Sequence, residues 1–359
     1  PPPSAAACHG CPPDDAAPAR YILHLFSGPY GRPDGLAAHV ALYGATCHDR
    51  DNGTDHAGQH GGWAHDITNP DFYDSLMADI TSGTITAIVA APPCSTFSAA
   101  RFLPLSPGHH GPPPVRDLHH PDGFPADRIP AGHERELHAA NAITRLLCQL
   151  LRAAHAHAVP FVVENPAPRH DPTLLDGKLF YPQTKLHGSL WLTTPIRELV
   201  RATGARLVTF AYCMLDTAAS TTPDQQKYTS VLYSASLEPA LSVLAPLVCT
   251  HPIESHAKHH GTARYSTATG YSTADLSPWP STLCSIVAYA VARRPSAPPT
   301  PGSILRVRPA AVPPPDPPAP PPPLPPPPPV PAHHPPPAAT GPRPDGGHHA
   351  LRPRRPAPA

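Results

Sequence analysis

The sequence predicts an α/β fold in which helices cover a mainly parallel sheet. Short apolar runs alternate along the chain with longer segments that have helical spacing. The runs are hydrophobic at successive positions rather than at alternate ones, which is typical of strands buried on both faces of a parallel sheet. Both patterns lie within residues 20–294 of the 359-residue chain, so we expect one folded domain there.

The first third of the chain alternates predicted strands and helices. Residues 21–26 (YILHLF) are an apolar run that stops at a glycine turn, and residues 84–91 (TITAIVAA) are rich in β-branched side chains and stop at a double proline. Residues 45–47 predict a short strand between them. Apolar residues at helical spacing predict helices over 35–42 and 71–80.

The rest of the domain continues the same alternation. Residues 133–158 form the longest predicted helix, and residues 160–163 predict another buried strand. Residues 207–212 and 229–234 predict two further strands, and residues 282–291 predict a closing helix. The stretch 102–132, rich in Pro, Gly and His without periodicity, is expected to be a mobile loop.

The two ends of the chain differ in composition from this domain. Residues 1–19 are rich in Pro, Ala and Asp, and residues 295–359 hold nearly half of the 59 prolines. We expect both segments to be disordered, because neither has the apolar spacing of a packed core. Residues 320–331 favour a polyproline II rod, which is either a spacer or a site for a proline-binding module. The first residue is Pro1, as expected of a fragment, a processed product or a piece of a polyprotein.

Charge and composition exclude several classes of protein. The 26 basic and 26 acidic residues balance, which excludes a broadly basic surface that binds nucleic acid by charge alone. No apolar run approaches the ~18 residues of a membrane helix, so no membrane partner is expected. The eight cysteines are scattered and lack the density of a disulfide scaffold. We therefore expect an intracellular location, in the nucleus or cytoplasm, or a viral protein.

Polar residues and glycines follow the first two predicted strands, at the edge where a parallel sheet binds its ligands. Glycines there let a backbone approach a ligand closely, although a glycine after a strand also simply makes a turn. A carboxylate after the second strand accepts hydrogen bonds from ribose hydroxyls in dinucleotide folds, or is a solvated turn residue. The candidates at these positions are Phe26, Ser27, Gly28, Gly31, Asp49, Asp51 and, as a weaker third acid, Asp66.

The strongest signal is Pro92-Pro93-Cys94, which follows the strand at 84–91. A thiol at this edge acts as a nucleophile if a neighbouring cation or local dipole lowers its pKa, whereas a lone cysteine is otherwise a small buried hydrophobe. Glu164-Asn165 follows another strand, and together a carboxylate and an amide can read the edge of a base. Alone, the same residues are an ordinary strand ending.

Taken in this order, the motifs resemble those of the cytosine-5 DNA methyltransferases, and in particular divergent members associated with algae, viruses and mobile elements. The resemblance covers about residues 20–294 and is most specific at Pro92-Pro93-Cys94 and at Glu164-Asn165. It implies a Rossmann-like class I fold, S-adenosylmethionine as cofactor and DNA as substrate. It also implies that Cys94 attacks C6 of a flipped-out cytosine, that Glu164 binds N3 and the amino group, and that Asn165 supports the loop. The residues that it places around the cofactor are Phe26, Ser27, Gly28, Gly31, Asp49 or Asp51, Asp66 and Pro92.

The chain departs from the family pattern at several positions. His24 stands where the first motif usually has an acid, and Pro166 follows Glu-Asn where valine is usual. The sequence has no Gln-x-Arg-x-Arg segment and no long target-recognition segment. Arg101 and Arg169 are therefore candidates for the missing substrate contacts, together with Ser98.

A second group of potential ligands lies in the C-terminal half. Cys249, His251 and His256 are spaced at i, i+2 and i+7, and Cys213 at the end of a predicted strand could complete the four ligands of a structural zinc site. Such groups also arise by chance in a chain with 25 histidines.

We therefore predict a monomeric S-adenosylmethionine-dependent methyltransferase of the cytosine-5 DNA type. One alternative is a catalytically inactive relative that binds nucleic acid or protein within a mobile-element polyprotein. Another is a methyltransferase that acts on RNA or a different substrate. Cys94 and Glu164 favour the enzyme, and the missing arginine motif favours the alternatives.

Overall fold

The structure, a computed structural model, describes most of residues 19–293. The described residues are 19–28, 30–53, 61–102, 104–106, 109–110, 112–177, 179, 182–215, 227–251 and 279–293. The predicted leader, apart from residue 19, and the proline-rich tail at 295–359 lie outside them. None of the helices in the described part of the chain has the length and apolar character that crossing a bilayer requires.

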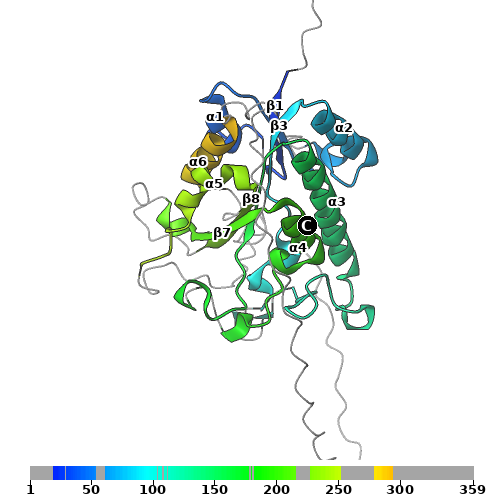
Figure 1. Cartoon of the computed structure of the whole chain (residues 1–359). Helices are drawn as coiled ribbons and strands as arrows, with labels where there is room; N and C mark the ends of the chain where they lie inside the picture. The colour runs from blue at the N-terminus through cyan, green and yellow to red at the C-terminus, as the bar shows by residue number, and fades with distance from the viewer. Residues whose placement is uncertain are drawn as a thin grey trace, which may run out of the picture. The chain divides into compact units, whose positions relative to one another are not determined.

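A six-stranded mixed sheet forms the centre of the fold (Figure 1), with the strand order β2-β1-β3-β6-β8-β7. The strands β1, β2, β3 and β6 pair in parallel, and β8 runs antiparallel to both of its neighbours. The prediction of an α/β fold with a mainly parallel sheet is confirmed, with this one antiparallel strand as the difference. The bounds are β1 Tyr21–Leu25, β2 Cys47–Arg50, β3 Ile85–Ala90, β6 Phe161–Pro166, β7 Arg206–Ala211 and β8 Tyr228–Tyr233, with a separate hairpin of β4 Pro104–Ser106 and β5 His109–His110.

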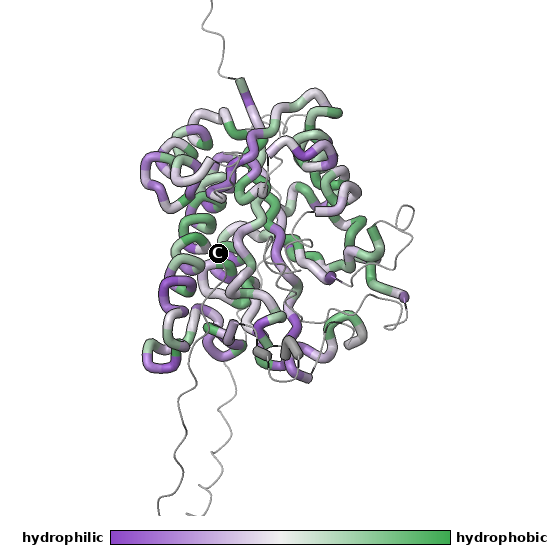
Figure 2. The backbone as a smooth tube through the Cα atoms, turned by 180° about the vertical axis from the view of Figure 1, so that it is seen from behind, coloured by the Kyte–Doolittle hydropathy of each residue, from purple (hydrophilic) through white to green (hydrophobic). Residues whose placement is uncertain are grey.

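Helices cover both faces of the sheet, with α2, α3 and α4 on one face and α1, α5 and α6 on the other (Figure 1). Leu23 packs in the first of these cores and its neighbour Ile22 in the second. Strands buried on both faces account for the continuous apolar runs in the sequence. Along the helices, hydrophobic and hydrophilic residues alternate, because only one side of each packs on the sheet (Figure 2). The bounds are α1 Leu36–Ala41, α2 Pro70–Thr81, α3 Glu134–Ala156, α4 Thr194–Thr203, α5 Glu238–Leu241 and α6 Ser281–Ala292.

The helix α4 was not among the predicted elements. It buries Ile196 and Leu199 against the core and ends at Gly204, whose φ of 65° is left-handed. The start and stop signals are present in the sequence, with Pro195 in the first turn and glycine after the last. The helix is only ten residues long, so its apolar periodicity is short.

The stretch 102–132 also differs from the expectation of a mobile loop. Val115 and Arg116 within it are fully buried. The Arg116 guanidinium lies 4.1 Å from the centre of the Phe97 ring and donates a hydrogen bond to Oδ1 of Asn141. This packing is invisible to a search for apolar periodicity, because a single arginine orders the segment through polar and cation–π contacts.

The strand β6 is longer than predicted, and this changes the place of two site residues. Glu164 and Asn165 lie within β6 and pair with Val231 and Ser230 of β8, whereas the sequence placed them after the strand. Both side chains are buried. Their orientation is therefore set by the sheet rather than by a turn.

Candidate functional site

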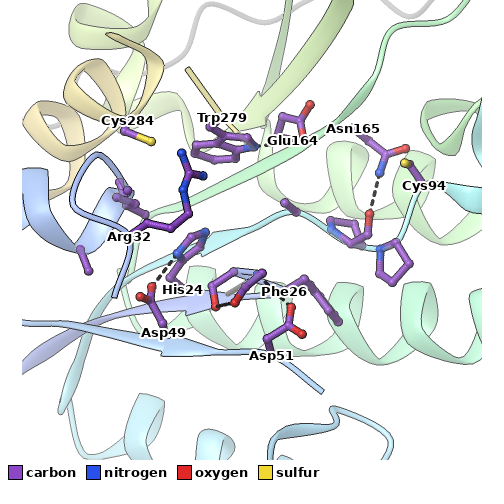
Figure 3. A pocket seen from close by; sticks show the side chains of 18 of the residues that line it. His24, Phe26, Arg32, Asp49, Asp51, Cys94, Glu164, Asn165, Trp279 and Cys284 are labelled. Atoms are coloured by element: carbon purple, nitrogen blue, oxygen red, sulfur yellow. Dashed lines mark hydrogen bonds and ion pairs between the residues drawn. The ribbon is translucent and has the colours of Figure 1, made fainter. Parts of the chain in front are cut away.

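A cavity of about 370 Å³ lies at the carboxyl edge of the parallel strands (Figure 3). The chain runs from β1 to β2 on one side and then returns to β3 on the other, so this edge includes a topological switch point between β1 and β3. The predicted site residues in its lining are Phe26, Ser27, Gly28, Asp49, Asp51, Pro92, Cys94, Glu164 and Asn165. The predicted site residues outside its lining are Gly31, Asp66, Ser98, Arg101 and Arg169.

The Glu164 carboxylate is held by donors from three separate segments. Tyr212 Oη and Thr229 Oγ1 donate to Oε1, the former at 3.2 Å, and Trp279 Nε1 donates to Oε2 at 3.2 Å. Burial, followed by the nearby Glu164 charge, raises the pKa of Tyr212 well above its ordinary value, so this hydroxyl remains a donor. Each carboxylate oxygen accepts about two hydrogen bonds, and the described residues therefore leave an acceptor position on Oε2.

Lys227, at the start of β8, adds a positive charge to the cavity. Its Nζ lies 3.9 Å from Oε1 of Glu164 and 4.5 Å from the centre of the Tyr212 ring. The structure therefore places the ammonium against a buried carboxylate. Arg32 is a second basic residue of the lining.

Cys94 is exposed to the cavity at the end of the Pro92-Pro93 loop. Desolvation by the surrounding protein raises the pKa of its thiol, and of the two nearby charges Lys227 lowers the pKa whereas Glu164 raises it. The net shift is upward. The sulfur is therefore a thiol at neutral pH and has to lose its proton when it acts as a nucleophile.

Asn165 connects β6 to the loop that carries Cys94. Its Nδ2 donates to the carbonyl oxygen of Pro92 at 2.9 Å, which also determines the orientation of the amide. Its Oδ1 is buried and has no hydrogen-bond partner among the described residues. Asn165 therefore holds the loop that carries Cys94 against β6.

The turn after β1 has an unusual backbone. Phe26 has a φ of 58°, in a region that bulky residues rarely adopt, and the backbone N–H groups of Phe26 and Ser27 donate to Arg50 O at 2.8 and 3.4 Å. Gly28 has a φ of 69°, and a Cβ added there would meet no heavy atom within 4 Å. The turn therefore presents an open backbone surface to the cavity.

Two carboxylates border this turn, and they have different partners. Asp51 accepts the Gly28 N–H at 2.9 Å and the Gly53 N–H at 2.7 Å, so it orders the turn. Asp49 Oδ1 lies 2.8 Å from His24 Nδ1, and no side-chain hydrogen bond from the described residues reaches its second oxygen. The sequence left these two acids as equal alternatives, and their contacts distinguish them.

Asp66 lies outside the lining of the cavity. It accepts hydrogen bonds from Asn52 Nδ2 at 2.7 Å and from the backbone and hydroxyl of Thr68 at 2.8 and 2.7 Å. Burial acts to raise the pKa of Asp66, and the hydrogen bonds from Thr68 and Asn52 outweigh it, so the net shift is downward. Asn52 itself lines the cavity and was not predicted.

The arginines expected to bind substrate have other contacts. Arg101 donates to the carbonyl oxygens of Ser95 at 2.6 Å and Pro113 at 2.8 Å and pairs with Glu136, and its side chain is 6 % exposed. The Arg169 guanidinium carbon lies 5.7 Å from the centre of the Tyr228 ring. Arg101 therefore joins the segment after Cys94 to α3.

Ser98 has a local contact as well. Its hydroxyl oxygen accepts a hydrogen bond from the backbone N–H of Ala100 at 3.2 Å. This bond lies in the short helical turns that follow Cys94.

His187 joins the two loops that carry the main site residues. One ring nitrogen, Nε2, lies 2.8 Å from the carbonyl oxygen of Phe97, and the other, Nδ1, accepts the Arg169 N–H at 3.1 Å. The carbonyl requires a proton on Nε2, so Nδ1 is the acceptor. No signal in the sequence indicates that His187 has this structural role, because it is one of 25 histidines and lies in no recognisable motif.

Two groups of metal-ligating side chains occur among the described residues. Cys213, Cys249 and His251 form the first, and His24, Cys47 and Asp49 form the second. Each group has its ligand atoms within 4.8 Å of one another. The first group contains three of the four predicted zinc ligands, and the fourth, His256, lies outside the described residues.

Comparison of the chain with protein-family models, with curated proteins and with solved structures yields no match. The chemistry of the cavity therefore carries the functional assignment.

Proposed function

We propose that the chain is an S-adenosylmethionine-dependent methyltransferase of the cytosine-5 type with a Rossmann-like class I fold. The observation that carries the proposal is the common cavity of Cys94 and Glu164, which are about seventy residues apart in sequence. A thiol and a buried carboxylate beside one ligand space are the pair that covalent activation of a pyrimidine requires. The strand order supports the fold, because ligands of doubly wound sheets bind at a switch point such as that between β1 and β3.

The lining fits the cofactor at three places. The open space at Gly28 accommodates a ligand close to the backbone, and the free oxygen of Asp49 suits a ribose hydroxyl. The Phe26 ring borders the same space. Bound there, S-adenosylmethionine supplies an electrophilic methyl group.

Cys94 and Glu164 would act on the base. Once the thiol proton has left to water, the Cys94 sulfur adds to C6 of an extruded cytosine and the electron pair of the C5–C6 double bond moves to C5. C5 would then take the methyl group from the sulfonium, and loss of the C5 proton to water would restore the double bond and release the Cys94 thiolate. The available position on Glu164 Oε2 suits a donor on the ligand, such as the amino group of cytosine. Lys227 stabilises the negative charge of the carboxylate at the same place.

A second candidate is a catalytically inactive module that binds the cofactor or a nucleic acid. The raised pKa of Cys94 favours it, because a thiol that stays protonated is a poor nucleophile. The position of Arg101, which is held by its own loop and α3, favours it as well. A third candidate is a methyltransferase whose substrate is RNA instead of DNA, and the experiment below distinguishes it from the other two.

The experiment is covalent trapping with 5-fluorocytosine in DNA and, in parallel, in RNA, using the full chain and S-adenosylmethionine. Fluorine at C5 prevents release of the enzyme, so an active protein accumulates an adduct of protein and nucleic acid. The adduct is expected with wild type and with Cys148→Ala, whose thiol is buried in α3, and is expected to be absent with Cys94→Ala. An adduct with RNA alone would identify an RNA methyltransferase.

Two results would contradict the proposal. One is an adduct that persists in Cys94→Ala. The other is the lack of any adduct by a protein that still binds S-adenosylmethionine in calorimetry, which would identify the inactive module.

A further inference from the structure

Cys213, Cys249 and His251 meet at the end of β7, away from the cavity residues that the proposed reaction uses. Their ligand atoms all lie within 4.8 Å of one another, and Cys249 Sγ is 3.6 Å from His251 Nδ1. In a tetrahedral zinc site with Zn–S of ~2.3 Å and Zn–N of ~2.0 Å, a sulfur and a nitrogen are about 3.6 Å apart. The observed separation is that of two ligands of one ion.

The backbone around the three side chains is already ordered. Cys213 lies in a short turn directly after β7, where the Ala211 N–H donates to Leu247 O at 2.8 Å. The Cys249 N–H donates to the hydroxyl of Tyr228 at 3.2 Å. These bonds bring two segments more than thirty residues apart in sequence to a fixed distance without any contribution from the cysteine side chains. A metal would therefore bind to a site whose geometry does not have to be formed first.

The surroundings favour zinc over other uses of the residues. Two thiolates and an imidazole are soft ligands, which suit zinc and do not suit magnesium or calcium. A disulfide between the two cysteines would leave His251 without a part in the group, and both cysteines are reduced in the structure. Cys249 is fully buried in an apolar cluster, which limits exchange with solvent.

We propose that Cys213, Cys249 and His251 bind a zinc ion that ties the end of β7 to the segment before residue 252. The proposal rests on these three ligands and not on residues outside the described part of the chain. Tyr212, which donates to Glu164, immediately precedes Cys213, so the ion also stabilises the turn from which this donor comes. The site is independent of the methyltransferase proposal and holds whichever reaction the cavity performs.

The test is the metal content of the full chain, purified under reducing conditions and measured by elemental mass spectrometry. One zinc ion per chain is expected for wild type, and the ion is expected to be lost in Cys213→Ser, Cys249→Ser and His251→Ala. Three controls are expected to keep it. Cys148→Ala removes a buried thiol elsewhere, Cys47→Ser removes a ligand of the second group, and Cys8→Ser with Cys11→Ser removes the CxxC pair of the leader.

Cobalt gives a second readout that does not depend on how stable the variants are. Replacing zinc by cobalt in wild type is expected to produce the absorption of thiolate bound to tetrahedral cobalt, and chelation is expected to lower the melting temperature. Three results would each overturn the proposal. The first is wild type without bound metal, and the second is loss of the metal in Cys47→Ser alone or in the variant that carries Cys8→Ser and Cys11→Ser alone. The third is an intact mass two hydrogens lower than that of the reduced chain, which marks a disulfide between Cys213 and Cys249.

Discussion

His187 is expected to make the stability of the domain depend on pH between neutral and acid conditions. The ring is fully buried and uses both nitrogens, one as a donor to Phe97 O and one as an acceptor from the Arg169 N–H. The pKa of the ring is lowered to about 4, and burial is the largest cause. The hydrogen bond to Phe97 O acts to raise the pKa, whereas the positive charges of Arg169 and His170 lower it further. A proton on Nδ1 would remove the acceptor and bury a charge.

The magnitude follows from the difference between the folded and the unfolded chain. The unfolded chain takes up the proton at a pKa of about 6.5, and the folded chain takes it up only near 4. Between these values unfolding binds a proton, so stability falls as pH falls. Each pKa unit corresponds to ~1.4 kcal/mol, and about 3 kcal/mol is therefore lost between pH 7 and 4. Above the unfolded pKa His187 contributes no further change.

The assay is urea unfolding at a series of pH values for wild type, His187→Gln and His138→Gln. The difference in free energy of unfolding between wild type and His187→Gln is expected to shrink by about 3 kcal/mol from pH 7 to pH 4. His138 is exposed on α3, and its variant is expected to follow the wild-type profile. If the profile of His187→Gln runs parallel to that of wild type, the two hydrogen bonds do not hold the neutral ring as described.

Two further predictions concern the cavity. Thr229→Val removes a donor to the buried Glu164 carboxylate and is expected to lower the free energy of unfolding by about 1.5–3 kcal/mol. Thr209→Val is the control, because it loses a bond between two neutral hydroxyls in the same sheet, and is expected to lower the free energy of unfolding by about 0.5–1.5 kcal/mol. Equal losses in urea titrations of the two variants would argue against a charged acceptor at Thr229. Alkylation of Cys94 by iodoacetamide, followed by peptide mass spectrometry, is expected to accelerate about tenfold per pH unit from about pH 7 to pH 9, because its raised pKa keeps the thiol protonated. A rate that levels off below about pH 8 would show a thiolate already formed.

Most strands of the sheet could be predicted from the sequence, because a buried strand is a continuous apolar run and can be recognised from neighbouring residues alone. The runs at 21–26 and 84–91 correspond to β1 and β3, each within a residue or two of its predicted bounds. The second strand lies later than predicted, at 47–50, since its half-buried polar residues have no apolar pattern. The sequence did not predict that residues 115–116 are buried and ordered, because their burial depends on contacts with Phe97 and Asn141 and not on apolar spacing.

The site was predictable to the extent that it depends on where strands end. Parallel strands have their carboxyl ends at one edge, so motifs after β3 and around the end of β6 could be placed together without coordinates. The partners of Glu164 could not be inferred in this way. Tyr212, Thr229 and Trp279 come from segments up to 115 residues away, and each would otherwise be read as a core residue.

By itself, the sequence determined the class of fold, the positions of its main strands and the edge of the sheet at which Cys94 and Glu164 lie, because these follow from periodicity and from the direction of neighbouring strands. Only the tertiary structure decided which charged and polar groups face one another: Asp49 beside His24 and Asp51 toward the Gly28 turn, Lys227 beside Glu164, and Arg101 against Glu136. Most buried polar groups need a hydrogen-bond partner, and that partner is set by distance in space, which local sequence does not record.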